Sequence, residues 1–298
     1  MVIGVLKELD LDFRVAMTPD VIKKMPSTSF YIESGAGARA GYSDGMFEAV
    51  AKVEAKRKQL IERSQILLAV NLPDDESIRS MKAGSVLIGQ LNPLKNAERL
   101  RHLARIGVSA FSLDWLPRIT RAQSMDVLSS QSNLAGYQAV VCAVSMLGRV
   151  FPMMTTAAGS IPPAKVLVVG AGVAGLQAIA TAKRLGAVVS AFDVRAAAKE
   201  QVESLGATFV SVPLDEGGED HGGYAKEMSE AYRLAQEAKL LEIMPKQDVI
   251  ITTAQIPNKP APKIITKSMV DKMKEGAFVI DLAGDSGGNC ELSVLGEC

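Results

Sequence analysis

The stretch at residues 165–193, KVLVVGAGVAGLQAIATAKRLGAVVSAFD, decides the fold of its part of the chain. It begins with Lys165–Gly170, a run of apolar and β-branched residues that is typical of a buried strand. The glycine-rich turn GAGVAG at 170–175 follows, and after it comes a helical pattern with its apolar residues on one face. A second strand pattern, Val188–Phe192, ends at Asp193. This order of strand, turn, helix and strand indicates a dinucleotide-binding α/β unit.

Each glycine of the turn has a physical task. Gly170 permits the tight turn, Gly172 lets backbone N–H groups approach a pyrophosphate, and Gly175 lets the helix pack closely on the strand. The helix N-terminus directs unpaired N–H donors and the positive end of its dipole at the phosphates. A glycine-rich turn alone is weak evidence, but here the flanking strand, helix and acid are all present. We therefore predict that the turn, with Val173 and Ala174, binds a dinucleotide.

Asp193 at the end of the second strand predicts which dinucleotide is bound. Its carboxylate can accept hydrogen bonds from the adenosine ribose hydroxyls and repel a 2′-phosphate, which selects NAD. Arg195 follows two residues later and could instead meet the 2′-phosphate of NADP. Because the acid stands at the key position, NAD is the cofactor we expect.

Length and composition limit the classes of protein to which this chain can belong. The 298 residues exceed one typical domain, so we expect two, and 48% hydrophobic residues exclude global disorder. Lys+Arg and Asp+Glu balance at 33 each, which gives no reason to expect nucleic-acid binding. The three scattered cysteines form no CxxC pair, so we predict no disulfide framework and no metal site. The N-terminus lacks a signal-peptide pattern and the apolar runs are strand-length, so we expect a soluble polypeptide.

Strand and helix patterns alternate along the first 115 residues, which predicts a parallel sheet with helices on its faces. A helix start is indicated at Thr18-Pro19, and two further helical patterns cover 74–81 and 96–105. The expected strands are Val2–Leu6, Phe30–Ile32, Ile66–Val70, Val86–Ile88 and Val108–Leu113.

A long helical pattern, Asp126–Met146, leads to the Gly-, Ser- and Pro-rich stretch 157–165. Along this helix we place the boundary between an N-terminal Rossmann-like domain at 1–128 and the NAD-binding domain at 129–298. The fold class is thus α/β, with two doubly wound parallel-sheet domains.

Two later strand patterns, Asp248–Thr253 and Ala277–Leu282, complete the second sheet. Their carboxyl ends should face the cofactor, so the loops Ala254–Pro257 and Ala283–Asn289 are expected to line its nicotinamide half. The polar, glycine-rich segment Asp215–Tyr224 has the composition of a mobile lid, although a plain solvated loop would have the same composition.

The segment 117–137 is too polar for a core helix and, on composition alone, could be a solvated interdomain linker. However, its sequence PRITRAQSMDVLSSQSNLAGY, the block at 162–187, GGYAKEM at 222–228 and PNKPAPKIIT at 257–266 are far more specific than a glycine turn. Together they resemble the NAD(H)-binding component of proton-translocating nicotinamide nucleotide transhydrogenase, a family that is a sister of alanine dehydrogenase. The resemblance covers the whole chain.

The resemblance implies two Rossmann-like domains with the cofactor in the cleft between them, assembled as a homodimer. It implies hydride exchange between NAD(H) on this chain and NADP(H) on a partner domain, beside a membrane proton-channel domain. The chain would then lie on the cytoplasmic or organelle-matrix side of a membrane, peripheral through its partner subunit.

The resemblance also assigns site residues. Arg118 and Asp126 would fix the carboxamide and ribose of the nicotinamide half, Gln123 would reach toward the NADP(H) domain, and Ser129 would complete the catalytic set. Tyr224 would lie at the tip of the mobile loop. The remaining matched cofactor positions are Ile119, Thr120, Ser124, Met125, Asp193, Val194, Arg195, Gly223, Gln236, Thr253, Ala254 and Gln255.

Two alternatives stay open. Alanine dehydrogenase needs a lysine and a histidine for acid–base work, but the matching positions are Asn71 and Asn92; Arg14 matches a carboxylate-binding arginine that both families share. Asp285 in AGDSGGN does resemble the alanine dehydrogenase residue. Family members also continue beyond residue 298 to finish the second sheet, so a noncatalytic NAD-binding module is the other alternative.

Overall fold

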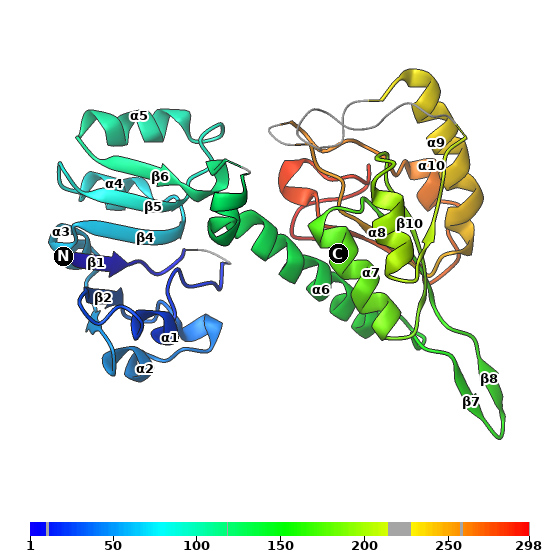
Figure 1. Ribbon diagram of the computed structural model, residues 1–298, viewed down its shortest axis with the longest axis horizontal. Helices are drawn as coiled ribbons and strands as arrows, with labels where there is room; N and C mark the ends of the chain where they lie inside the picture. The colour runs from blue at the N-terminus through cyan, green and yellow to red at the C-terminus, as the bar shows by residue number, and fades with distance from the viewer. Residues whose placement is uncertain (10–11, 118, 214–227, 257–258, 298) are drawn as a thin grey trace. The chain divides into compact units, whose positions relative to one another are not determined.

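The computed structural model describes residues 1–9, 12–117, 119–213, 228–256 and 259–297. The chain divides into two compact units, Met1–Leu128 and Ser129–Cys298. Figure 1 shows a sheet with helices around it in each unit. Within the described part of the chain, no helix is both long and apolar enough to cross a membrane.

The N-terminal unit is built on a six-stranded parallel sheet with the order β3-β2-β1-β4-β5-β6. This order confirms the predicted parallel sheet and places the reversal of strand order between β1 and β4. The strands are β1 (Val2–Val5), β2 (Ser29–Glu33), β3 (Lys52–Glu54), β4 (Ile66–Asn71), β5 (Val86–Gln90) and β6 (Ser109–Ser112).

Short helices supply apolar side chains to two separate core clusters of this unit. One cluster contains Ile22 and Phe47 from the first two helices, and the other contains Leu60, Ile78 and Leu103 from the next three. Burial of both clusters explains why the strands lack a clean polar face. The helices are α1 (Pro19–Ile22), α2 (Asp44–Glu48), α3 (Arg57–Arg63), α4 (Asp75–Arg79) and α5 (Ala97–Arg105). The sequence patterns did not predict β3, α2 or α3.

The long helix α6 (Val127–Met146) begins at the boundary of the two units. Its buried side chains, among them Ala139, Val140 and Ala143, join a core cluster of the C-terminal unit. A Cβ atom at Gly136 would lie 2.1 Å from the carbonyl oxygen of Ala174, so glycine allows this helix to approach the turn at the start of α7 (Val173–Arg184).

The C-terminal unit has a five-stranded parallel sheet with the order β11-β10-β9-β12-β13. Strand order reverses between β9 and β12, as the doubly wound prediction requires. Its strands are β9 (Lys165–Val169), β10 (Val188–Phe192), β11 (Thr208–Phe209), β12 (Val249–Thr252) and β13 (Phe278–Asp281). The other helices of this unit are α8 (Ala198–Ser204), α9 (Glu230–Ile243) and α10 (Lys267–Val270).

An antiparallel hairpin, β7 (Met154–Thr156) and β8 (Gly159–Ile161), lies between α6 and β9. In Figure 1 it extends away from the sheet of its unit, in green. All six strand residues are exposed, so the hairpin has no buried face and no alternating pattern. The sequence therefore predicted only a connecting stretch here.

Candidate functional site

The glycine-rich turn joins β9 to α7 and has the geometry of a phosphate-binding loop. Gly170 has φ +98°, which favours glycine, and a Cβ at Gly175 would lie 1.8 Å from the carbonyl oxygen of Gly170. By contrast, among the described residues no heavy atom lies within 4 Å of a Cβ built on Gly172. Gly175 is therefore required by packing within the protein, whereas Gly172 borders open space where a pyrophosphate can approach.

Asp193 follows β10 and is nine-tenths buried. Its Oδ2 accepts a hydrogen bond from the N–H of Ala171 at 2.7 Å, which ties the end of β10 to the glycine-rich turn. Arg195 donates its backbone N–H (2.8 Å) and Nε (2.9 Å) to Oδ1 and its Nη2 (2.9 Å) to Oδ2. The acid predicted to bind ribose and the nearby arginine thus form one ion pair beside the turn.

The loop after β12 joins the same edge of the sheet. The N–H of Thr253 donates to the carbonyl of Val169 (2.8 Å), and its Oγ1 donates to the carbonyl of Gly170 (2.9 Å). The tertiary structure therefore brings residues 170–175, 193–195 and 253–255 together at the carboxyl ends of β9, β10 and β12. This is the position at which doubly wound sheets bind their ligands.

The loop after β13 is held by Asp281 and by Asn289. Asp281 accepts hydrogen bonds from the N–H groups of Ala283 (3.0 Å) and Cys290 (2.9 Å) and from Oγ of Ser293 (2.7 Å). Burial raises the pKa of Asp281, but these hydrogen bonds outweigh it and hold the pKa below its usual range. Asp285 lies in a short 3-10 turn, Gly284–Ser286, of this loop.

Asn289 was predicted only as the end of the loop expected to line the nicotinamide half. Its side chain is fully buried and bonds to the backbone of Ala254. The signal that could have found it is the pair of glycines before it, because Gly287 and Gly288 both have positive φ and turn the chain back toward the sheet.

The other predicted site residues lie elsewhere in the fold. A 3-10 helix, η3 (Thr120–Met125), at the end of the N-terminal unit carries Gln123, Ser124 and Met125 as exposed residues. Asp126 closes it by donating its N–H to the carbonyl of Gln123 at 3.2 Å. Ile119 precedes η3, Ser129 is in the first turns of α6, and Gln236 is buried in α9. Val194 belongs instead to the edge already described, between Asp193 and Arg195. Arg118, Gly223, Tyr224 and the predicted lid 215–224 lie outside the described residues.

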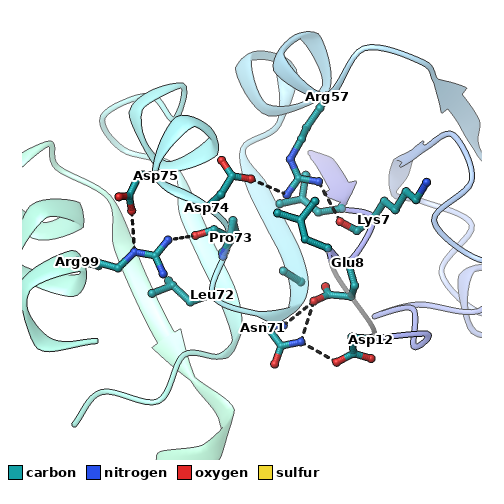
Figure 2. Close-up of a pocket in the computed structure, with 13 residues that line it drawn as sticks. Lys7, Glu8, Asp12, Arg57, Asn71, Leu72, Pro73, Asp74, Asp75 and Arg99 are labelled. Carbon is teal, nitrogen blue, oxygen red and sulfur yellow. Dashed lines mark hydrogen bonds and ion pairs between the residues drawn. The ribbon is translucent and has the colours of Figure 1, made fainter. Parts of the chain in front are cut away.

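The N-terminal unit has a cavity of about 650 Å³ where its own strand order reverses. Asn71, at the end of β4, lines it and donates Nδ2 to Glu8 (2.9 Å) and Asp12 (2.7 Å), as Figure 2 shows. Asp12 in turn holds Arg14, with Nε–Oδ1 at 2.9 Å and Nη2–Oδ2 at 2.6 Å. The hydrogen bond from Arg14 lowers the pKa of Asp12 to about 2.

Amides occupy the two positions that the sequence analysis matched to the lysine and histidine of alanine dehydrogenase, and of the two only Asn71 lines the cavity. Asn71 presents an amide, which does not titrate. Asn92 adopts a left-handed conformation, with φ +45°, and its N–H donates to Asp114 at 3.1 Å. Arginines line the cavity too: Figure 2 shows Arg57 reaching toward Asp74, and Arg99 bonded to Asp75 and to the carbonyl of Pro73.

Family models match both units of the chain. The model for the N-terminal domain of alanine dehydrogenase/PNT matches residues 4–135, and the model for the C-terminal domain matches residues 139–297. The chain belongs to the alanine dehydrogenase/PNT family. The resemblance inferred from the sequence motifs is confirmed.

Individual relatives favour the transhydrogenase branch of this family. The chain is 49% identical over 295 residues to the first part of NAD(P) transhydrogenase subunit alpha of Rhodospirillum rubrum, covering 95% of this chain and 77% of that protein. It is 45% identical to NAD(P) transhydrogenase subunit alpha of Cereibacter sphaeroides, covering 99% of this chain but only 57% of that protein. An alanine dehydrogenase from Halomonas elongata is more distant, at 29% identity over 98% of this chain and 75% of its own length.

A solved structure agrees with these relatives. The crystal structure of transhydrogenase from Sinorhizobium meliloti has a TM-score of 0.87 and 44% identity, and covers 99% of this chain and 82% of that one. Comparisons of sequence and of structure therefore both support the fold of two Rossmann-like units and the transhydrogenase branch.

Proposed function

We propose that this chain is the NAD(H)-binding component of a proton-translocating transhydrogenase, exchanging hydride with NADP(H) bound on a partner domain. The observation that carries the proposal is the edge of the second sheet, where an open glycine turn, a buried acid and the loop after β12 meet. These groups fit the three parts of NAD(H), with Gly172 toward the pyrophosphate, Asp193 toward the adenosine ribose and residues 253–255 toward the nicotinamide half.

Hydride exchange of this kind needs positioning rather than acid–base chemistry. When bound, the two nicotinamides would supply the chemistry, which is hydride transfer between them. The residues of the chain orient and hold the ring, and their contribution is geometric. The amides Asn71 and Asn92 are consistent with this, since a reaction on an amino acid would need a titratable group there.

We assign the nicotinamide end to the segment around η3. Arg118, Gln123, Asp126 and Ser129 form the proposed catalytic set, and Gln123 is the residue aimed at the NADP(H) of the partner. Its exposure on a 3-10 helix supports a contact made only after the partner docks. Ile119, Thr120, Ser124, Met125, Val194, Gly223, Tyr224 and Gln236 complete the proposed cofactor contacts, with Gly223 and Tyr224 in the proposed lid.

We further propose that the chain is a homodimer, attached through its partner subunits to the cytoplasmic or organelle-matrix side of a membrane. Apolar side chains remain exposed on α6, among them Leu134 and Tyr137, and on and beside the β7–β8 hairpin, among them Met153 and Ile161. Exposed apolar side chains on these two elements support burial against a second copy.

The test is hydride exchange between NADH and an NADP⁺ analogue of distinct absorbance, with and without the NADP(H)-binding partner domain. Gln123→Ala should leave NADH affinity nearly unchanged yet slow exchange at least about tenfold, or ~1.4 kcal/mol on the barrier. Asp126→Ala should lower both affinity and rate, because it holds the NAD(H) ribose in either state.

Arg121→Ala is the matched control, since Arg121 is an exposed neighbour on η3 that is not assigned to the site. It should exchange hydride at the wild-type rate. A Gln123→Ala chain of full speed would show that the segment is a linker, and wild-type NADH binding without exchange would favour a noncatalytic module.

A further inference from the structure

Asn289 is buried at the carboxyl edge of the second sheet, beside the loops that follow β12 and β13. Its side chain is 0% exposed. Its Oδ1 accepts the N–H of Ala254 at 2.9 Å, and its Nδ2 donates to the carbonyl oxygens of Ala254 (2.8 Å) and Pro262 (2.9 Å). Both amide donors and the amide oxygen therefore have partners, and all three partners are backbone groups.

The two bonds to Ala254 hold one residue from both its N–H and its C=O. This fixes the backbone torsions of Ala254 and therefore the direction in which the chain continues to Gln255. On the preceding side, Thr253 is bonded to the glycine-rich turn through Gly170. The segment 253–255 is thus hydrogen-bonded on one side to the glycine-rich turn and on the other side to the side chain of Asn289.

The backbone conformation of the loop after β13 places Asn289 at this position. Gly287 and Gly288 reverse the chain with φ +102° and +79°, and a Cβ at Gly288 would lie 2.8 Å from Oδ2 of Asp281. The backbone carbonyl of Asn289 accepts the N–H groups of Ile264 (2.8 Å) and Ile265 (3.0 Å). Its backbone is therefore anchored independently of its side chain, which leaves the amide free to act on Ala254.

We infer that Asn289 is a positioning residue for hydride exchange, which sets the orientation of Ala254 and Gln255 against the nicotinamide half of NAD(H). This inference rests on the proposed function. Gln255 itself is exposed and donates Nε2 to Oγ of Ser286 at 3.3 Å, so its side chain reaches the same loop that carries Asn289. An amide at position 289 thereby couples the loops after β12 and β13 into one surface for the cofactor.

The experiment compares Asn289→Ala with Gln247→Ala in the full chain reconstituted with its partner subunits. Gln247 is a matched control, because it is also a buried amide bonded to backbone (Nε2 to the carbonyl of Ile243, 3.1 Å) but lies at the amino end of β12, away from the site. Both substitutions leave backbone groups unpaired, so both should lower the melting temperature. The rate of exchange and the affinity for NADH should distinguish the two variants.

Asn289→Ala should lower kcat for exchange at saturating NADH at least about fivefold and raise the Kd for NADH by a smaller factor. Gln247→Ala should change both by less than about twofold. Asn289→Ser, which keeps one polar atom, should fall between wild type and Asn289→Ala, and it replaces that variant if the alanine chain does not fold.

Wild-type activity separates the two proposals. Absent exchange in the wild type overturns the proposed function. Exchange in the wild type with an Asn289 variant of unchanged kcat, or with an equal loss in Gln247→Ala, overturns the positioning role alone.

Discussion

Arg195 donates hydrogen bonds to both carboxylate oxygens of Asp193, and the N–H of Ala171 donates to the same carboxylate. The two residues that could decide between NAD and NADP are therefore in direct contact. Asp193 repels a 2′-phosphate and Arg195 attracts one, so cofactor preference reflects the balance between these opposite charges. Because Asp193 is also held by a hydrogen bond from the glycine-rich turn, we expect its repulsion of a 2′-phosphate to outweigh the attraction by Arg195.

This balance predicts reciprocal effects of two substitutions. Asp193→Asn should narrow the preference for NADH over NADPH by at least ~1 kcal/mol, the scale of a hydrogen bond to a charged group. Arg195→Ala should widen the preference, because it removes the positive charge nearest the 2′-phosphate. Fluorescence titration of both cofactors against each variant measures this. Equal affinity of the wild-type chain for NADH and NADPH would contradict the NAD assignment.

Alanine substitutions at Gly175 and at Gly172, two of the three glycines of the turn, should have different effects. Gly175→Ala forces its Cβ against the carbonyl of Gly170 and should destabilise the protein by roughly 1–3 kcal/mol. Gly172→Ala meets open space, so it should keep the wild-type melting temperature but weaken NADH binding where the pyrophosphate approaches. Thermal unfolding and NADH titration of both variants test the contrast. Gly172→Ala with undiminished affinity would remove the pyrophosphate from this side of the turn.

Asp248 should make the second unit sensitive to acid. It is buried and accepts hydrogen bonds from the N–H of Lys165 (2.7 Å), from Arg149 (3.1 Å) and from Lys274 (2.7 Å). Burial raises the pKa of Asp248, but the bonds from Lys274 and Lys165 and the two positive charges outweigh it and lower the pKa. Because the pKa of Asp248 is lower in the folded than in the unfolded state, its carboxylate stabilises the fold above the unfolded-state pKa of about 4. This contribution is lost as the pH falls below that pKa.

Asp248→Asn should therefore lower the free energy of unfolding by roughly 1–3 kcal/mol at neutral pH, and the difference from wild type should shrink toward pH 3. Denaturant unfolding at several pH values measures it. Asp20→Asn is the control: Asp20 pairs with Lys23 at an exposed site and should change little at any pH. A pH-independent difference for Asp248→Asn would assign its effect to packing instead of charge.

The chain should not reduce NAD⁺ with alanine. Asn71 and Asn92 cannot exchange protons with an imine, and the amide of Asn71 is bonded to Glu8 and Asp12. Absorbance of NADH, followed with alanine from about pH 6 to about pH 10, should stay at background. Robust turnover without a partner domain would instead move this chain to the alanine dehydrogenase branch.

Local patterns in the sequence were sufficient for the parallel arrangement of both sheets, although not for the edge strands β3 and β11, and for the glycine-rich turn. The strand at 165–169 and the helix after the turn are encoded in residues next to one another, and glycine at 170 and 175 follows from a sterically crowded backbone. The long helix ending at Met146 was likewise readable, because its apolar residues continue without a breaker. The family and the NAD motif could both be inferred from the amino-acid sequence alone.

Contacts between distant segments needed the folded chain. Asn289 meets Ala254 across 35 residues, and Asp248 meets Arg149 across 99, and neither pairing leaves a periodic trace in the sequence. The β7–β8 hairpin was missed because strands exposed on both faces carry no hydrophobic alternation. Periodicity reports which face of an element is buried, whereas the partner of a buried polar group is set by how the loops at the sheet edge come together in space.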